Sequence, residues 1–450
     1  MRQAVLLIHG IGEQRPMDSL REFVDAVWTR DREVQRPGAN AGAFWSKPYT
    51  LSQDFELRRL TTGENRAGHR TDFFEFYWAH LMHGTTMGHV VAWAATLLWR
   101  KPSRVPKELR GAWVLIWLLL LAGVGAALAF ALHRTQVPPW VPVLVNAVVL
   151  PAAYAVIRNI VGDAARYLHV SPRNVQRRHA IRSAGFKVLK SLHKQGYDRI
   201  VVVGHSLGSV IGYDILSHAW GAWHTEDTGE GTKNFTVTEA LENLAAEHAE
   251  HGRFSIDEFR KGQHACFDEL RHNGSRWCVS DFVTLGSPLA HAPVLLANDA
   301  EDLKRRFEQR ELPTCPPTLE ASPRGLRFTY TDGERRTLLH QAALFAPTRW
   351  TNLYFPARAL VFGDAIGGPL APLFGPGVVD VPVCTKARLG LLSHTLYWSP
   401  GSVEGDDAHL AALRRAIDLA GAGAQDSPEM PGAGRATRTS SSMATGRTSG

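Results

Sequence analysis

The residues most able to do chemistry form one five-residue motif of the pattern G-x-S-x-G, which consists of Gly204, His205, Ser206, Leu207 and Gly208. This pattern places a serine on a sharp turn between a strand and a helix, where its hydroxyl is exposed for nucleophilic attack. The neighbouring sequence fits that setting, because the β-branched run 199–203 predicts a buried strand and the apolar segment 207–220 predicts a helix. The two glycines are needed because side chains there would collide with the tight turn. Ser206 is therefore the predicted nucleophile.

A serine that attacks an acyl carbonyl also needs N–H donors for the oxyanion of the tetrahedral intermediate. The first predicted donor is the backbone N–H of Leu207, directly after the nucleophile. The second is expected in a loop after an earlier strand, where the sequence has His-Gly-Ile-Gly at 9–12. The Ile11 N–H is the best candidate, with His9 and Gly10 supporting the loop. A glycine turn with a structural histidine is the alternative interpretation of these residues.

Predicted strands and helices alternate along the chain, and this alternation indicates an α/β fold. The run 199–203 is rich in β-branched residues, as expected of a parallel strand covered on both faces. The other predicted strands are 5–8, 73–78, 278–285, 350–355 and 378–383, and the predicted helices are 19–28, 181–192, 207–220, 238–248 and 256–270.

Two uncharged segments, 111–132 and 137–157, are each long enough to cross the roughly 30 Å hydrocarbon core of a bilayer as a helix. Two prolines in the second segment disfavour a straight helix but are compatible with a spanning one. A buried core helix is the alternative for each segment. Basic residues flank both outer ends of the pair, whereas the turn between the segments carries only Arg134, so both outer ends are predicted to face the cytoplasm.

A third uncharged run, 81–99, is interrupted by glycines and histidines, and it is predicted to be an interfacial helix. An even number of spans keeps the parts of the chain before and after the insert in one compartment. The apolar run at the N-terminus is too short for a signal peptide, so the chain is expected to begin directly with the fold on the cytoplasmic side.

Composition excludes several other classes of function. The 450-residue chain has a net charge of +7, but much of the basic excess flanks the apolar segments, and no basic stripe with interleaved aromatics predicts nucleic-acid binding. The four cysteines lie far apart with no C-x-x-C pair, which argues against a disulfide scaffold and a zinc site. His80, His83 and His89 lack carboxylates at ligand spacing, so no metal or cofactor is expected.

The motif at 203–208 and the opening Leu-Ile-His-Gly at 7–10 resemble the α/β-hydrolase superfamily. The chain looks like its lipase-like members, including acyl-hydrolases related to GPI inositol-deacylase and bacterial membrane-associated relatives. The segment 284–288 (Thr-Leu-Gly-Ser-Pro) is similar to the corresponding segment of such lipases. The resemblance covers roughly 1–80 and 180–400. It implies a mostly parallel sheet with helices on both faces, and hydrolysis without a metal or organic cofactor.

The order nucleophile, acid, histidine that this resemblance implies restricts the remaining partners of the serine. His394 occupies the loop expected after the last predicted strand, and His409 lies much later. The acid is expected between the last two predicted strands, where Asp364 is the only carboxylate. Many relatives carry the acid sooner after the strand, and Asp380 and Asp332 are therefore the alternatives.

These elements predict a membrane-anchored serine hydrolase that cleaves an acyl ester through Ser206, His394 and Asp364, with a membrane lipid as a candidate substrate. A non-catalytic membrane scaffold that kept the fold is the alternative, and a thioesterase or amidase would use the same three residues. The predicted parts are one catalytic domain formed by 1–80 and 179–420, a membrane insert at 81–178, a possible lid at 221–276, and a disordered tail at 421–450.

Overall fold

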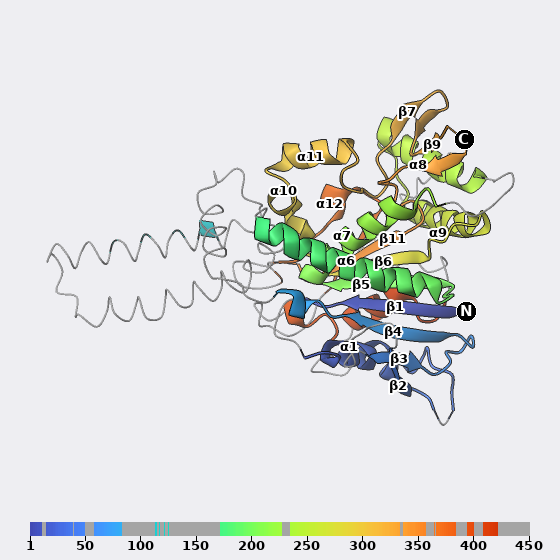
Figure 1. Ribbon diagram of the computed structural model, residues 1–450, viewed down its shortest axis with the longest axis vertical. Helices are drawn as coiled ribbons and strands as arrows, with labels where there is room; N and C mark the ends of the chain where they lie inside the picture. The colour runs from blue at the N-terminus through green and yellow to red at the C-terminus, as the bar shows by residue number, and fades with distance from the viewer. Residues whose placement is uncertain are drawn as a thin grey trace, which may run out of the picture.

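An eight-stranded mixed sheet forms the centre of the fold, in the order β12-β11-β6-β5-β1-β4-β3-β2 (Figure 1). The strands from β12 to β4 in this order pair in parallel, and β3 and β2 add an antiparallel edge. Their bounds are β1 (Arg2–Ile8), β2 (Phe44–Pro48), β3 (Arg58–Thr62), β4 (Arg70–Phe76), β5 (Arg199–His205), β6 (Val279–Leu285), β11 (Arg349–Tyr354) and β12 (Val378–Pro382).

The computed structural model describes residues 1–10, 15–38, 40–49, 58–82, 113, 114, 117, 121, 125, 172–226, 235–333, 336–356, 364, 366–383, 394–399 and 408–421. Within these residues the prediction of an α/β fold with a mostly parallel sheet is confirmed. The short antiparallel edge was not predicted from the sequence. Most residues of β2 are exposed, and its sequence lacks the alternation of apolar and polar residues that indicates a strand.

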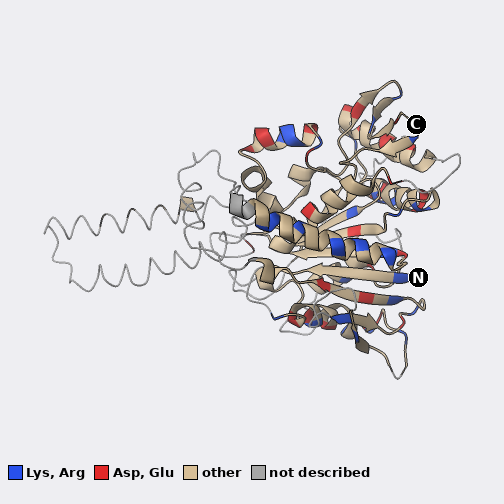
Figure 2. Ribbon diagram, viewed as in Figure 1, with Lys and Arg blue, Asp and Glu red and all other residues tan. Residues whose placement is uncertain are grey.

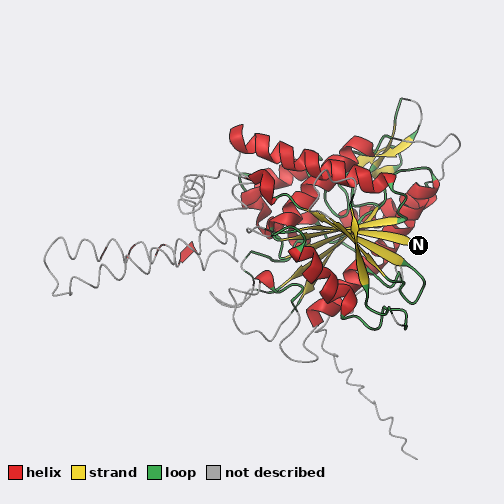
Figure 3. Ribbon diagram, turned by 60° about the horizontal axis from the view of Figure 1, so that its bottom comes forward, coloured by secondary structure: helices red, strands yellow, loops and turns green. Residues whose placement is uncertain are grey.

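Helices cover both faces of the sheet, as Figure 3 shows. One face carries α6 (Pro172–Lys194), α7 (Leu207–Trp223), α8 (Thr236–His251) and α9 (Ile256–His272). The other face carries α1 (Asp18–Val24), a π-helical turn (Asp25–Thr29) and α13 (Ala408–Ile417). Each layer of helices encloses its own apolar core with the sheet, and this double coverage explains why every residue of β5 and β6 is buried.

Shorter elements complete the described chain. They are the 3-10 helices Ala79–Met82 (η2) and Pro288–His291 (η5), the helices α10 (Ala292–Leu295), α11 (Ala300–Glu308) and α12 (Ala371–Phe374), and the hairpins β7 (Glu320–Ser322) with β8 (Gly325–Arg327) and β9 (Thr329–Thr331) with β10 (Thr337–Leu339).

The predicted lid, 221–276, contains α8 and α9. The Gln263 amide of α9 donates to the carbonyls of Phe345 and Thr348, at 2.7 and 3.1 Å, just before β11 begins. Figure 1 shows both helices on the side of the molecule where β1 begins, whereas Ser206 follows the end of β5. The lid stays a prediction. In the described structure α9 covers the start of β11, and α8 packs on α9.

No helix within the described ranges combines the length and apolar composition needed to cross a bilayer. The predicted spans 111–132 and 137–157 lie outside those ranges except for a few positions in the first. The predicted interfacial run is described only at its start, and the predicted tail only at Gly421.

Charged side chains lie mainly on the helices and at strand ends, and Figure 2 shows both signs interspersed over most of the described surface. The exception is α6, which carries Lys and Arg along its length and no acidic residue. This helix begins at Pro172, inside the last part of the predicted membrane insert (81–178) and after its second predicted span, so its charge agrees with the basic flank seen in the sequence.

Gly208 provides a test of how closely α7 packs on the sheet. A methyl group at this position would lie 2.1 Å from the carbonyl oxygen of Ile8 in β1. We therefore expect Gly208→Ala to lower the free energy of unfolding by roughly 3 kcal/mol, because main-chain atoms must move to admit the methyl group. The measurement is thermal unfolding of the purified chain.

Gly221→Ala is the matched control, because Gly221 lies in the same helix and its methyl would meet only the Gln341 carbonyl, at 3.9 Å. We expect it to be neutral or stabilising by up to about 1 kcal/mol. Equal stability of the two variants would show that α7 does not sit this close to β1.

Candidate active site

Ser206 occupies the turn between β5 and α7, at the side of the sheet formed by the carboxyl ends of the parallel strands. Its backbone has φ 53° and ψ −129°, a strained conformation for a residue with a side chain. The Ser206 N–H donates to the Leu285 carbonyl at the end of β6, at 2.9 Å. Strand, turn and helix thus have the arrangement that the G-x-S-x-G motif predicts, and they fix the direction of the serine hydroxyl.

The three residues predicted to act together lie in hydrogen-bond contact. The Ser206 hydroxyl is 2.7 Å from His394 Nε2, and His394 Nδ1 is 2.9 Å from Asp364 Oδ2. With Nδ1–H donating to the carboxylate, Nε2 presents its lone pair to the serine hydroxyl. The contacts join residues that are 188 and 30 positions apart in the chain.

Asp364 is almost completely buried, with 1% of its surface exposed. Burial by itself would raise the pKa of this carboxyl group, but the neighbouring His394 ring and the hydrogen bonds from His394 and Tyr397 outweigh burial and lower the pKa to about 2. The Tyr397 hydroxyl donates to Oδ2 at 2.8 Å, and the Ile366 N–H donates to Oδ1 at 2.8 Å. Asp364 therefore remains ionised and fixed in orientation.

His205 holds the main chain of the histidine loop. Burial and, second, the nearby His394 lower the pKa of His205 to about 3, so the ring is neutral. Its Nε2–H donates to the His394 carbonyl at 2.8 Å, and the ring packs edge-on against Trp398 with centroids 4.8 Å apart. His394 is thus positioned twice, through its side chain by Asp364 and through its backbone by His205.

A second set of contacts supports the serine turn from behind. The Ser209 hydroxyl lies 2.5 Å from the Ser206 carbonyl and 2.6 Å from the Ser287 hydroxyl. The Leu289 N–H donates to Ser287 Oγ at 3.2 Å. Ser287, which follows β6, is completely buried, so it supports the turn and is not a second nucleophile.

Gly286 allows the acid and Tyr397 to approach β6. Its φ is +56°, and a Cβ there would lie 2.6 Å from the Tyr397 ring and 2.7 Å from Asp364 Oδ2. The segment predicted as similar to lipases therefore has a local role, because its glycine leaves space for the carboxylate and its serine supports the turn.

The predicted oxyanion donors are described in part. Leu207 is the first residue of α7, so its N–H has no acceptor within the helix. Ile11 lies outside the described residues. Gly10 packs directly against Ser206 and His205, which brings the end of β1 beside the serine turn.

His9 anchors the start of the loop that contains Ile11. Its ring stacks on Trp78 with centroids 5.4 Å apart, and the Trp78 indole N–H donates to the His9 carbonyl at 3.0 Å. Burial lowers the pKa of His9 to about 4, although the hydrogen bond to the Gly10 carbonyl acts to raise it. At the other end of the loop, the Met17 N–H donates to Glu75 Oε2 at 2.7 Å.

The alternative acids and the alternative histidine have other contacts. Asp380 accepts hydrogen bonds from Asn352 and from the N–H groups of Leu370 and Ala371, and so it organises the segment before α12. Asp332 pairs with Arg336 within a turn. His409 Nε2 bonds to the Ser399 carbonyl at 2.8 Å.

Tyr397, Ser209 and the positioning contact of His205 were not predicted from the sequence. No motif marks a tyrosine three residues after a histidine as a partner of the acid. Ser209 directly follows the second glycine of the G-x-S-x-G motif, and this position is only a weak indication that it supports the turn.

The described part of the chain holds no group of histidine, cysteine and acidic side chains that could bind a metal ion. Cys266, Cys278 and Cys315 are buried free thiols, and burial raises the pKa of each, so they are poor nucleophiles. Among the described residues of the site, the arrangement best suited to nucleophilic chemistry is therefore Ser206 with His394 and Asp364.

We expect His205→Ala to slow the reaction of Ser206 with a fluorophosphonate about 10- to 100-fold, because His394 loses the contact that holds its main chain. His205→Gln keeps an N–H donor and should recover part of the rate. The control is His218→Ala, which removes an exposed histidine from α7. A wild-type rate for His205→Ala would mean that the contact has no role in positioning His394.

Comparison of the chain with protein-family models, with curated proteins and with solved structures finds no match in any of the three.

Proposed function

We propose that the protein is a serine hydrolase of the α/β-hydrolase type that cleaves an acyl ester. The observation that carries this proposal is the 2.7 Å contact between the Ser206 hydroxyl and His394 Nε2, with Asp364 on the opposite side of the same imidazole. A general base within hydrogen-bond distance of a serine, itself oriented by a buried carboxylate, is the arrangement that activates a serine nucleophile.

The proposed reaction proceeds in two halves. His394 Nε2 accepts the Ser206 proton while Oγ attacks the acyl carbon, and the N–H groups of Leu207 and of the loop after β1 stabilise the resulting oxyanion. Collapse of this intermediate breaks the ester bond, and the departing alcohol takes the proton from His394. Water then attacks the acyl-enzyme with the same base, which releases the acid and restores Ser206.

Asp364 stabilises the imidazolium that forms in each half of this reaction. Its pKa of about 2 means that it stays a carboxylate and does not take the proton itself. The Tyr397 hydroxyl and the Ile366 N–H occupy its remaining acceptor positions, so the carboxylate has little freedom to turn away from His394.

A membrane lipid is the substrate class that the chain connection favours. The described chain leaves the fold at η2, ending with Met82, and returns at α6, beginning with Pro172, and these two helices contact each other. η2 follows the end of β4, so the predicted insert departs from the edge of the sheet that carries Ser206. If 111–132 and 137–157 span a bilayer as the sequence predicts, that bilayer faces the proposed active site.

Ser206→Ala should reduce hydrolysis of p-nitrophenyl esters and of phospholipids in mixed micelles by at least about a thousandfold, because the nucleophile is lost. Ser217→Ala, which removes another serine hydroxyl from the middle of α7, is the matched control and should retain activity. Rates across esters of increasing acyl length, thioesters and amides identify the bond class.

A wild-type chain that is folded but hydrolyses none of these substrates, and does not react with a fluorophosphonate, would favour a membrane scaffold. Equal activity of wild type and Ser206→Ala would show that another group performs the reaction.

Asp364→Asn should lower kcat by about 10⁴-fold, because an amide cannot hold the imidazole in the tautomer that accepts the serine proton. Asp332→Asn tests the alternative acid in the same assay and should leave kcat unchanged, since Asp332 pairs with Arg336. If Asp332→Asn were the impaired variant, the assignment of the acid would be wrong.

A further inference from the structure

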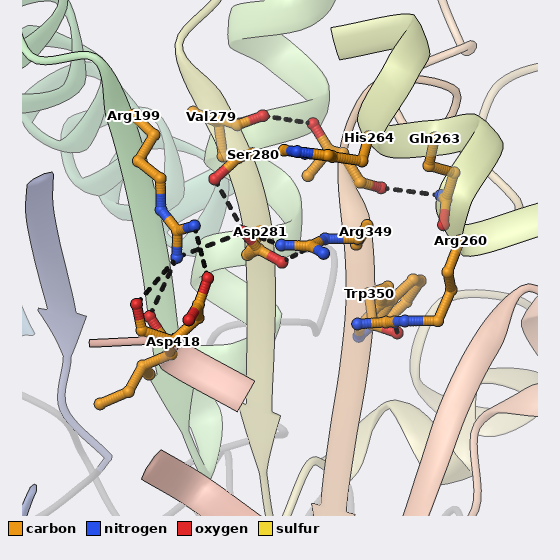
Figure 4. A network of polar contacts seen from close by, with 12 residues as sticks. Arg199, Arg260, Gln263, His264, Val279, Ser280, Asp281, Arg349, Trp350 and Asp418 are labelled. Atoms are coloured by element: carbon orange, nitrogen blue, oxygen red, sulfur yellow. Dashed lines mark hydrogen bonds and ion pairs between the residues drawn. The ribbon is translucent and has the colours of Figure 1, made fainter. Parts of the chain in front are cut away.

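The end of the sheet where the parallel strands begin contains a cavity of about 390 Å³. Its lining includes Asp281 of β6, Arg349 of β11, Arg260 of α9 and residues near the end of α13. Ser206 lies at the opposite end of β5, so this cavity has no part in the proposed ester hydrolysis. Figure 4 shows charged side chains of β5, β6, β11 and α9 near one another, together with Asp418 after α13.

Asp281 and Arg349 form a closed pair in this network. Arg349 donates from Nε and Nη2 to the two carboxylate oxygens of Asp281, at 2.8 and 3.0 Å, and both side chains are buried. Burial opposes ionisation of Asp281, but Arg349 and Arg199 lower its pKa to about 2. Ser280 occupies a further position on the carboxylate, at 2.7 Å. The side-chain hydrogen bonds to Asp281 therefore come from Arg349 and Ser280, and none comes from Arg260.

Two further acidic groups of the cavity wall, Asp418 and Asp31, also have partners. Asp418, which follows α13, accepts from Arg199 at 2.9 Å. Asp31 lies 3.7 Å from Arg414, which also donates to the Ala26 carbonyl. At the exposed rim, Glu33 and Arg415 carry opposite charges.

In the part of the chain that the structure describes, Arg260 has no carboxylate partner, unlike Arg349 and Arg414 of the same cavity wall. Its hydrogen bond is to the Trp350 carbonyl at 3.5 Å, and no carboxylate of the described residues lies within 4.0 Å of its guanidinium. Desolvation and, second, the like charge of Arg349 lower the pKa of Arg260 to about 10, although Asp281 and Asp257 oppose this decrease. Arg260 is part-buried, and withdrawing a cation from water without a counter-charge in direct contact is costly, because its lost hydration is not replaced.

We propose that this cavity is a binding site for a small molecule or ion with a carboxylate or phosphate group, and that Arg260 is its principal ligand. A guanidinium presents parallel N–H donors that match the oxygens of both groups. The volume falls within the range of small-molecule sites, roughly 300–1,000 Å³. One bound anion would supply the counter-charge that Arg260 lacks.

The variant that tests this site is Arg260→Met, which keeps the aliphatic length of the side chain but removes the guanidinium. The full chain in detergent is titrated calorimetrically with inorganic phosphate and, separately, with acetate, at an ionic strength held constant with chloride. We expect wild type to bind at least one of these anions with one site, and Arg260→Met to bind it at least 10-fold more weakly. The two probes distinguish a phosphate site from a carboxylate site.

Lys261→Met is the matched control, because it removes one positive charge from the neighbouring, exposed position of α9. It should bind like wild type. Circular dichroism verifies the fold of each variant, and Arg260→Gln replaces Arg260→Met if the latter does not fold. The proposal is overturned if wild type binds neither anion, or if Arg260 variants and wild type bind equally. Neither outcome affects the ester hydrolysis proposed for Ser206.

Discussion

The structure depends on the parallel alignment of its central strands, because only this alignment brings the ends of distant segments to one edge. β1, β5, β6 and β11 all finish there, and each supplies something different: the loop after β1, the serine turn after β5, the buried glycine and serine after β6, and the segment that leads to the acid. Ser206 and His394, which are 188 positions apart in the chain, can then form a hydrogen bond of 2.7 Å between Oγ and Nε2. A one-residue slip between neighbouring strands would turn each of these side chains to the other face of the sheet.

Buried charged groups are paired differently at the two ends of the parallel strands. Where the strands end, one carboxylate accepts hydrogen bonds from His394, Tyr397 and a backbone N–H, and burial keeps the nearby His205 neutral. Where they begin, the cavity wall carries four arginines and four acidic residues, but Arg260 lies beside a like charge and has no carboxylate of the described residues within 4.0 Å. The first end is electrostatically complete without a bound molecule, whereas the second is not. This difference is why we assign acyl chemistry to one end and anion binding to the other.

Local sequence patterns were enough to predict most of the sheet and the strand–turn–helix that carries Ser206. The run at 199–203 and the two glycines around Ser206 act within a few residues of one another, so the turn they form could be inferred directly. The partners of Ser206 required the order of elements along the chain, and Asp364 could be named only because its interval contains no other carboxylate. Tyr397 and the cavity around Arg260 could not be predicted, since both depend on contacts between segments whose spacing in the sequence carries no periodic signal.

The contact between η2 and α6 means that the described fold meets on both sides of the segment that connects these two helices. The chain departs and returns at neighbouring points, as in domains that host another domain within a surface loop. A few flexible residues in place of 83–171 would join the same two ends, and an excised body of this kind would be a compact scaffold for engineering. Evolution could have gained or exchanged the inserted segment by the same route, without disturbing strand order.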